Sequence, residues 1–131
     1  MATPARAGTL IYAKNPSVVS RFYQGLLGAR LLHADDEHEV LANADTQLII
    51  HAIPAQYAES IVVSVPPVPR DEQATKPFFT IADLNAAESA CIELGGLVLG
   101  PIWPGPGMRV RNVCDPEGNI IHLRQMHVDS R

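Results

Sequence analysis

A pattern of a short apolar run, a polar residue and a longer amphipathic stretch occurs twice along the chain. The runs TLIYA (Thr9 to Ala13) and PFFTIA (Pro77 to Ala82) have the composition of strands. Asn15 and Asp83 follow these runs and are residues that often cap helices. Apolar residues then recur on one helical face: Val18, Val19, Phe22 and Leu26 in the first half, and Ala86, Ala87, Ala90 and Leu94 in the second. The pattern predicts a strand and then a sheet-covering helix in each half.

The two halves are related by a constant spacing. Asn15 and Asp83 are 68 positions apart, and so are Gly28 and Gly96, which follow the helical stretches. A spacing that holds through strand, cap, helix and glycine indicates an internal duplication. Because glycine readily adopts the left-handed conformation that ends a helix, we expect Gly28 and Gly96 to end the two helices.

Three further strands are predicted in each half. They cover Arg30 to His33, His38 to Leu41 and Gln47 to Ala52, and then Val98 to Ile102, Arg109 to Val113 and Asn119 to Arg124. The connection contains an expected extra strand, Ser60 to Val65, followed by prolines that cannot donate ladder hydrogen bonds. The predicted fold class is α+β, with two tandem βαβββ modules. Module one spans about 8–53, the connection about 54–75, module two about 76–125 and a frayed tail 126–131.

Composition and charge narrow the classes of function. A chain of 131 residues with 47% hydrophobic and 18% charged residues fits a single folded domain. The net charge of -4 and the scattered basic residues argue against a nucleic-acid or membrane partner. No apolar run approaches the ~20 residues of a membrane helix, and no signal peptide is recognisable, so the expected location is the cytoplasm. Cys91 and Cys114 form no C-x-x-C motif, and we expect inert thiols, with a reactive thiol as the alternative.

Three motifs carry a resemblance to a known family. FYQGLLGA in the first helix, LGG after the second helix and DPEGNIIHLRQ near the end of the chain are similar to the vicinal oxygen chelate superfamily, from about Gly8 to Gln125. This superfamily includes glyoxalase I, extradiol dioxygenases and the fosfomycin and bleomycin resistance proteins. The motif Asp115 to Asn119 is the most specific, and its proline and glycine suit a tight turn. The resemblance implies two modules whose mixed sheets curl around a shared cleft, and a homodimer.

Enzymes of this superfamily commonly bind a divalent metal through His and Glu on the first and last strands of each module. The first-strand ligand lies about seven residues before the helix cap, which corresponds to Gly8 and Lys76 here. Glycine has no donor atom, and a lysine ammonium repels a cation. The last-strand Glu corresponds to His122, and to His51 if the two copies of the IIH motif are matched; a register shifted by one gives Ile50 instead.

Three interpretations of His51 and His122 remain open. The two histidines could hold a catalytic metal, but such a site normally has three protein ligands and the pattern supplies no third. They could be half-buried strand residues with satisfied ring nitrogens. They could also be polar points in a metal-free, largely apolar pocket. We therefore expect a binding protein for a small apolar or aromatic molecule without a cofactor. The alternative is a metal-dependent lyase or dioxygenase that uses His51 and His122 as ligands or as acid and base.

Strand alternation predicts which side chains face the cleft. Leu10, Ile49 and Ile120 share the cleft face with the candidate residues, whereas Ile11, Ile50, Phe79 and Ile121 face the helices. Trp103 is expected either at the rim of the cleft, stacking on a ligand, or packed against its own module. Met108 is expected in an adaptable wall. The expected ligand-binding residues are Tyr12, His51, Phe78, Thr80, Trp103, Met108 and His122.

Two groups of charged residues are considered separately from the cleft. The acidic run of Asp35, Asp36, Glu37 and Glu39 lies around His33 and His38 and is expected to be a solvated turn, with a calcium or acid-base site as the alternative. Arg109 and Arg111 share one strand face and are expected to be solvated or paired.

Overall fold

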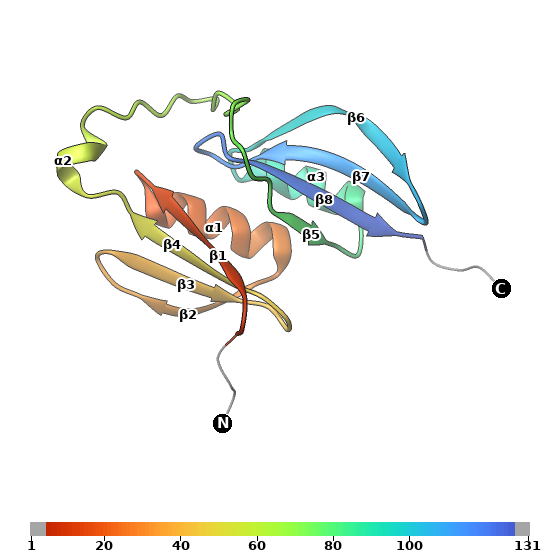
Figure 1. Cartoon of the computed structure of the whole chain (residues 1–131), viewed down its shortest axis with the longest axis horizontal. Coiled ribbons are helices and arrows are strands. Elements are labelled where there is room, and N and C mark those ends of the chain that lie inside the picture. Colours follow the sequence, from red (N-terminus) through yellow and green to blue (C-terminus); the bar gives the residue numbers. More distant parts are fainter. Residues whose placement is uncertain (1–4, 128–131) are drawn as a thin grey trace. The chain divides into compact units, whose positions relative to one another are not determined.

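The chain divides into two compact units with the boundary between Val63 and Ser64, inside the predicted connection. Figure 1 shows the computed structural model, which describes residues 5–127. Each unit contains a four-stranded mixed sheet and a helix that packs on one face of that sheet. The names module one and module two are used below for these two units, and the connection, 54–75, is divided between them. The prediction of a frayed tail is wrong at its first two residues, because Met126 ends the last strand and the amide of His127 donates to the carbonyl oxygen of Gly107. The rest of the tail, 128–131, lies outside the described residues.

Module one has the predicted order of elements. They are β1 (Gly8–Ala13), α1 (Pro16–Leu27), β2 (Arg30–Ala34), β3 (His38–Ala42) and β4 (Gln47–Ala52). The sheet order is β1-β4-β3-β2, with β1 parallel to β4 and the other neighbours antiparallel. The first and last strands of the module therefore lie side by side.

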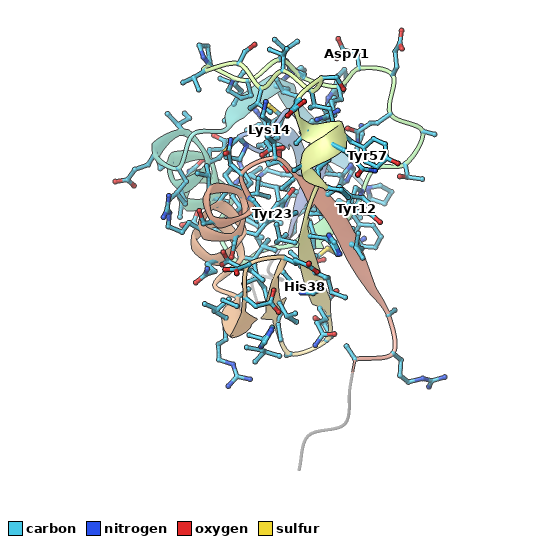
Figure 2. All side chains as sticks on the ribbon, turned by 90° about the vertical axis from the view of Figure 1, so that its left-hand side faces the viewer. Tyr12, Lys14, Tyr23, His38, Tyr57 and Asp71 are labelled. Atoms are coloured by element: carbon cyan, nitrogen blue, oxygen red, sulfur yellow. The ribbon has the colours of Figure 1, made fainter. Side chains whose placement is uncertain are left out.

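The core of module one lies between α1 and the sheet. Val19, Phe22 and Leu26 are buried as predicted, and Tyr23 is buried beside them. Tyr12 projects from the opposite face of β1, as Figure 2 shows. The helix starts without a side-chain cap from Asn15, contrary to the prediction. The carbonyl oxygen of Asn15 accepts hydrogen bonds from the amides of Val18 and Val19 instead. The proline at the first helical position has the backbone φ that a helix requires.

Module two repeats this order with a shorter helix. Its elements are β5 (Phe78–Thr80), α3 (Leu84–Glu93), β6 (Leu97–Gly105), β7 (Met108–Cys114) and β8 (Ile120–Met126), in the sheet order β5-β8-β7-β6. Asp83 caps α3 as predicted, because its carboxylate accepts from two backbone amides of the first turn. Gly95, and not Gly96, takes the left-handed conformation after the helix. Since α3 has 10 residues and α1 has 12, the spacing of 68 does not extend to the helix ends.

The buried face of α3 also differs in part from the prediction. Leu84, Ala87 and Cys91 are buried, whereas Ala86 is exposed. Burial raises the pKa of Cys91 to about 12 and also raises that of Cys114. Both thiols therefore stay protonated at neutral pH.

The connection contains a short helix, α2 (Ala55–Ala58), in place of the predicted strand from Ser60 to Val65. The backbone amides of Ser60 and Ile61 donate to carbonyl oxygens of α2, so they are not available to a sheet. Val62 and Val65 are 84% and 96% exposed. Valine-rich composition favours a strand, but no neighbouring strand is paired with this segment. No helix within residues 5–127 is long and apolar enough to cross a membrane.

The turn Asp115–Asn119 fixes the entry into β8. The carboxylate of Asp115 accepts from the amides of Glu117 and Asn119 at 2.9 and 3.1 Å and from the Asn119 side chain at 2.9 Å. Gly118 has φ 87°, and a β-carbon at this position would collide with the carbonyl oxygen of Val68. The connection thus packs directly on a buried turn.

This contact predicts unequal effects of two glycine substitutions. Gly107→Ala should cost about 1 kcal/mol, because Gly107 also has a positive φ but has open space around it. Gly118→Ala should cost more than about 2 kcal/mol, because the Val68 carbonyl must also move. Urea unfolding of both variants measures the difference. Equal losses of stability would show that the contact with Val68 carries no energy.

Candidate functional site

The two faces of each sheet differ as strand alternation predicts. Ile11, Ile50, Phe79 and Ile121 are buried on the faces that the helices cover. The opposite face of each sheet, here called the open face, carries the candidate residues. Exposed aromatic side chains lie on it, with Tyr12, Phe78 and Trp103 exposed by 58%, 59% and 53%.

Strand register determines which candidates are neighbours. In module one, His51 is the direct partner of Tyr12 on β1 and of His38 on β3. In module two, His122 is the direct partner of Phe78 on β5 and of Asn112 on β7. The residue beside each histidine is therefore Tyr12 in one module and Phe78 in the other, 66 positions apart. This differs from the spacing of 68 between the caps, because Tyr12 lies three residues before Asn15 and Phe78 lies five residues before Asp83.

A chain of ring contacts crosses the open face of module one. The Tyr12 and His51 ring centroids are 5.4 Å apart, and those of His51 and His38 are 4.8 Å apart with the rings nearly perpendicular. The amide of Ala52 donates to the carbonyl oxygen of Glu37. His38 and His51 are therefore at the adjacent non-hydrogen-bonded position, where cross-strand side chains are closest.

Hydrogen bonds fix the tautomers of these two histidines. His51 Nδ1 donates to the carbonyl oxygen of Ala52 at 2.7 Å, and His38 Nδ1 donates to Asp35 Oδ1 at 2.9 Å. Carbonyl and carboxylate oxygens only accept, so in the neutral rings the Nε2 atoms carry the lone pairs. The open face of module one thus presents two imidazole acceptors and the exposed ring of Tyr12.

Asp35 organises the turn between β2 and β3. Hydrogen bonds from His33, from the amides of Glu37 and His38 and from the His38 ring hold the pKa of Asp35 well below its usual range. Asp35, Asp36 and Glu37 form an exposed turn, as predicted, whereas Glu39 lies in β3 and is half-buried. The carboxylate of Asp35 nevertheless forms hydrogen bonds with both His33 and His38, which the sequence did not predict.

A cluster of cationic side chains surrounds His122 in module two. Burial, then Lys76, then Arg124 lower the pKa of His122 below its ordinary value of 6.5. Lys76 Nζ lies 3.4 Å from Asn112 Oδ1, and Asn112 is the β7 partner of His122. The imidazole is therefore neutral at pH 7, between an ammonium and a guanidinium.

Residues that pair directly across the four strands form a row on this face. The row two residues beyond His122 along β8 contains Thr80, Arg124, Val110 and Trp103. Arg124 Nε donates to Thr80 Oγ1 at 2.8 Å, and the guanidinium carbon lies 4.5 Å from the Phe78 ring centroid. Trp103 lies within β6, one residue beyond the end of the strand predicted from Val98 to Ile102. Met108 lies one further row along the same face, opposite Met126.

The face between Phe78 and Trp103 therefore has aromatic edges and a polar centre. Phe78 and Trp103 lie on the outermost strands, three strand spacings or roughly 14 Å apart. We call this surface the module-two face; it consists of Lys76, Phe78, Thr80, Trp103, Val110, Asn112, His122 and Arg124. Sequence reasoning placed Lys76 and His122 at neighbouring positions of the superfamily metal site but missed Asn112 as a neighbour of both. Arg124 could have been found, because it is two residues after His122 in the same strand.

The positions of the superfamily metal ligands offer poor donors. A β-carbon at Gly8 would collide with the carbonyl oxygen of Gln47, so this backbone admits no ligating side chain. Lys76 places an ammonium beside His122. Across the described residues, no group of three or more His, Cys, Asp or Glu side chains is arranged to hold a metal ion. His51 and His122 belong to different modules, each with its own partners.

Two further features lie apart from these clusters. A hollow of about 280 Å³ borders Gly8, Leu10, Gln47 and Ile49 in module one, and neither candidate histidine lines it.

The two arginines of β7 lie on the helix-covered face of module two. Arg111 faces α3, where its Nε lies 3.6 Å from Glu88 Oε1. Arg109 donates to the side chain of Gln125 at 3.3 Å on the same face. Both arginines are thus directed away from the module-two face.

Comparison with solved structures identifies the fold. A glyoxalase/bleomycin resistance protein/dioxygenase family enzyme from Burkholderia phytofirmans PsJN has a TM-score of 0.69 and 15% identity over 94% of this chain and 99% of that chain. A glyoxalase/bleomycin resistance protein from Albidiferax ferrireducens T118 has a TM-score of 0.66 and 17% identity, covering 91% and 96%. The fosfomycin resistance protein FosX from Mesorhizobium loti has a TM-score of 0.65 and 15% identity, covering 98% and 96%. No protein-family model and no curated protein match the sequence.

The chain has the glyoxalase/bleomycin resistance/dioxygenase fold, built from two βαβββ modules with unclosed mixed sheets. The resemblance to the vicinal oxygen chelate superfamily that was inferred from the sequence is confirmed at the level of the fold. At 15–17% identity, the likeness assigns no reaction to this chain.

The charges around His122 predict a specific titration behaviour. Its NMR titration midpoint should lie below 6.5 in the wild type. Lys76→Gln should move the midpoint upward, because a positive charge that disfavours the imidazolium is removed. Arg109→Gln is the matched control on the opposite sheet face and should leave the midpoint unchanged. An unchanged midpoint in Lys76→Gln would contradict the proximity of Lys76 and His122.

Proposed function

We propose that this protein binds a small molecule with an apolar or aromatic part on the module-two face and that this binding needs no metal. The observation that carries the proposal is the pair of exposed aromatic side chains, Phe78 and Trp103, at the two edges of a polar centre. Apolar surfaces with a few oriented polar groups are typical of small-molecule sites. Val110, which lies in the row between them, supplies an apolar part of the floor.

The donor set supports metal-independent binding. Position 8 has no room for a side chain, and the ammonium of Lys76 lies near His122, where a metal would add a further positive charge. The fold is shared with proteins named for resistance to bleomycin and fosfomycin, which supports a small molecule as the ligand class.

A metal-dependent lyase or dioxygenase is the second candidate. It is favoured by His51, whose Nδ1–H is held by a backbone carbonyl while Nε2 keeps its lone pair. Metal-ligating histidines usually have this arrangement. In this candidate His51 and His122 serve as ligands, or as acid and base.

Metal analysis distinguishes the two candidates. Protein purified without chelators should contain far less than one transition-metal ion per chain. Added zinc or nickel should not change the affinity of the module-two face for an aromatic probe such as naphthalene-2-carboxylate, followed by the indole NMR signal of Trp103, the only tryptophan.

The variants His51→Ala and His122→Ala give the control. About one tightly bound metal per chain that is lost in both variants would establish the metal-dependent candidate and overturn the proposal. Folding of the variants is checked by circular dichroism.

A further inference from the structure

We infer that the molecule held on the module-two face is an aromatic anion, with a carboxylate, sulfonate or phosphonate group bound between Lys76 and Arg124. The inference rests on the proposed function and names its ligand class. It rests on the positive charge of the face, whereas the proposed function rests on the exposed aromatic side chains.

The two cations on this face have no carboxylate partner. Neither Lys76 nor Arg124 forms an ion pair with any acidic side chain in the part of the chain that the structure describes. Four acidic side chains of module two are engaged elsewhere: Asp83 caps α3, Glu88 lies beside Arg111, and Asp115 and Glu117 are buried in the turn before β8. A protein of net charge -4 thus keeps two cations together without neutralising them.

Arg124 is positioned for an anion by two contacts. Thr80 Oγ1 accepts from Nε, and the Phe78 ring lies under the guanidinium carbon. These contacts fix the plane of the group, and no other described hydrogen bond uses its terminal amino groups. A fixed guanidinium with a free pair of N–H donors matches the geometry of a carboxylate or phosphonate.

Lys76, Asn112 and His122 add weaker donors beside Arg124. The Lys76–Asn112 contact is long at 3.4 Å, so an anionic oxygen would be a better acceptor for the ammonium. The neutral imidazole of His122 carries one N–H that can donate to the same group. The anion would thus replace one poor hydrogen bond with several charge-assisted ones.

The size of the face favours a small anion over a polyanion. The rows of His122 and Arg124 are two residues apart, or roughly 7 Å, which matches one charged group and an adjoining ring system. Only two cations are present, and the net negative charge of the chain repels an extended polyanion such as nucleic acid. The exposed rings of Phe78 and Trp103 then provide contacts for the aromatic part.

Three naphthalene probes of similar shape test the inference. The full chain is titrated with naphthalene-2-carboxylate, neutral 2-naphthalenemethanol and cationic 2-naphthylmethylammonium, and the Trp103 indole signal is followed by NMR. We expect the carboxylate to bind about tenfold or more tightly than the neutral probe, a difference of about 1.4 kcal/mol. The cation should bind most weakly. Raising the salt concentration should weaken only the binding of the carboxylate.

Variants separate this inference from the proposed function. Arg124→Gln and Lys76→Gln should each reduce the affinity for the carboxylate by about tenfold and leave the neutral probe unaffected. Arg109→Gln, on the helix-covered face, is the matched control and should change neither affinity. Equal affinities for carboxylate and neutral probe, or unchanged carboxylate binding in both variants, would overturn the anion inference while the proposed function stands. No binding of any probe at millimolar concentration would overturn both.

Discussion

The arrangement of the module-two face depends on the register between β5 and β8. This pairing places Phe78 beside His122 and Thr80 beside Arg124, and β5 has only three residues. The preceding connection reinforces the short strand. The Gln73 side chain accepts from the amide of Ile120 and donates to its carbonyl oxygen, at 2.8 and 2.7 Å. The buried turn from Asp115 to Gly118 supports the start of β8 from the other side. A shift of two residues in this register, in either direction, would take Arg124 away from its position opposite Thr80.

The two modules share a fold and present different chemistry on equivalent faces. In module one, His51 lies between the ring of Tyr12 and His38, and Asp35 orients His38. In module two, His122 lies between Phe78 and Asn112, with Lys76 and Arg124 nearby. One face is thus rich in imidazole acceptors and the other in cationic donors. The two modules thus have the same order of elements and different side chains on equivalent faces.

The sequence predicted the elements of both modules and the direction in which most strand residues point. Alternation placed Ile50 and Ile121 toward the helices and the two histidines on the open faces, because the strand period of two is a strong constraint. The extra strand from Ser60 to Val65 was wrong, since composition does not reveal whether a partner strand is present. The repeat of 68 was also wrong at Gly96, because a helix that is shorter by two residues keeps almost the same apolar pattern.

Long-range neighbours were the part of the site that the sequence could not supply. Lys76 precedes β5, and its proximity to Asn112 across three strands follows only from the sheet order. The contact of Asp35 with His38 and His33 depends on the shape of one turn. Candidate residues were therefore predictable one by one, whereas the charge of the face emerged only from their assembly in three dimensions.

A crystal structure of the protein bound to naphthalene-2-carboxylate, with anomalous diffraction data for transition metals, tests the central claim most directly. The account predicts the carboxylate within hydrogen-bond distance of Arg124 and the ring system over the face between Phe78 and Trp103. It also predicts no anomalous signal at His51 or His122. A metal ion bound by either histidine and contacting the ligand, or a ligand bound away from the module-two face, would contradict it.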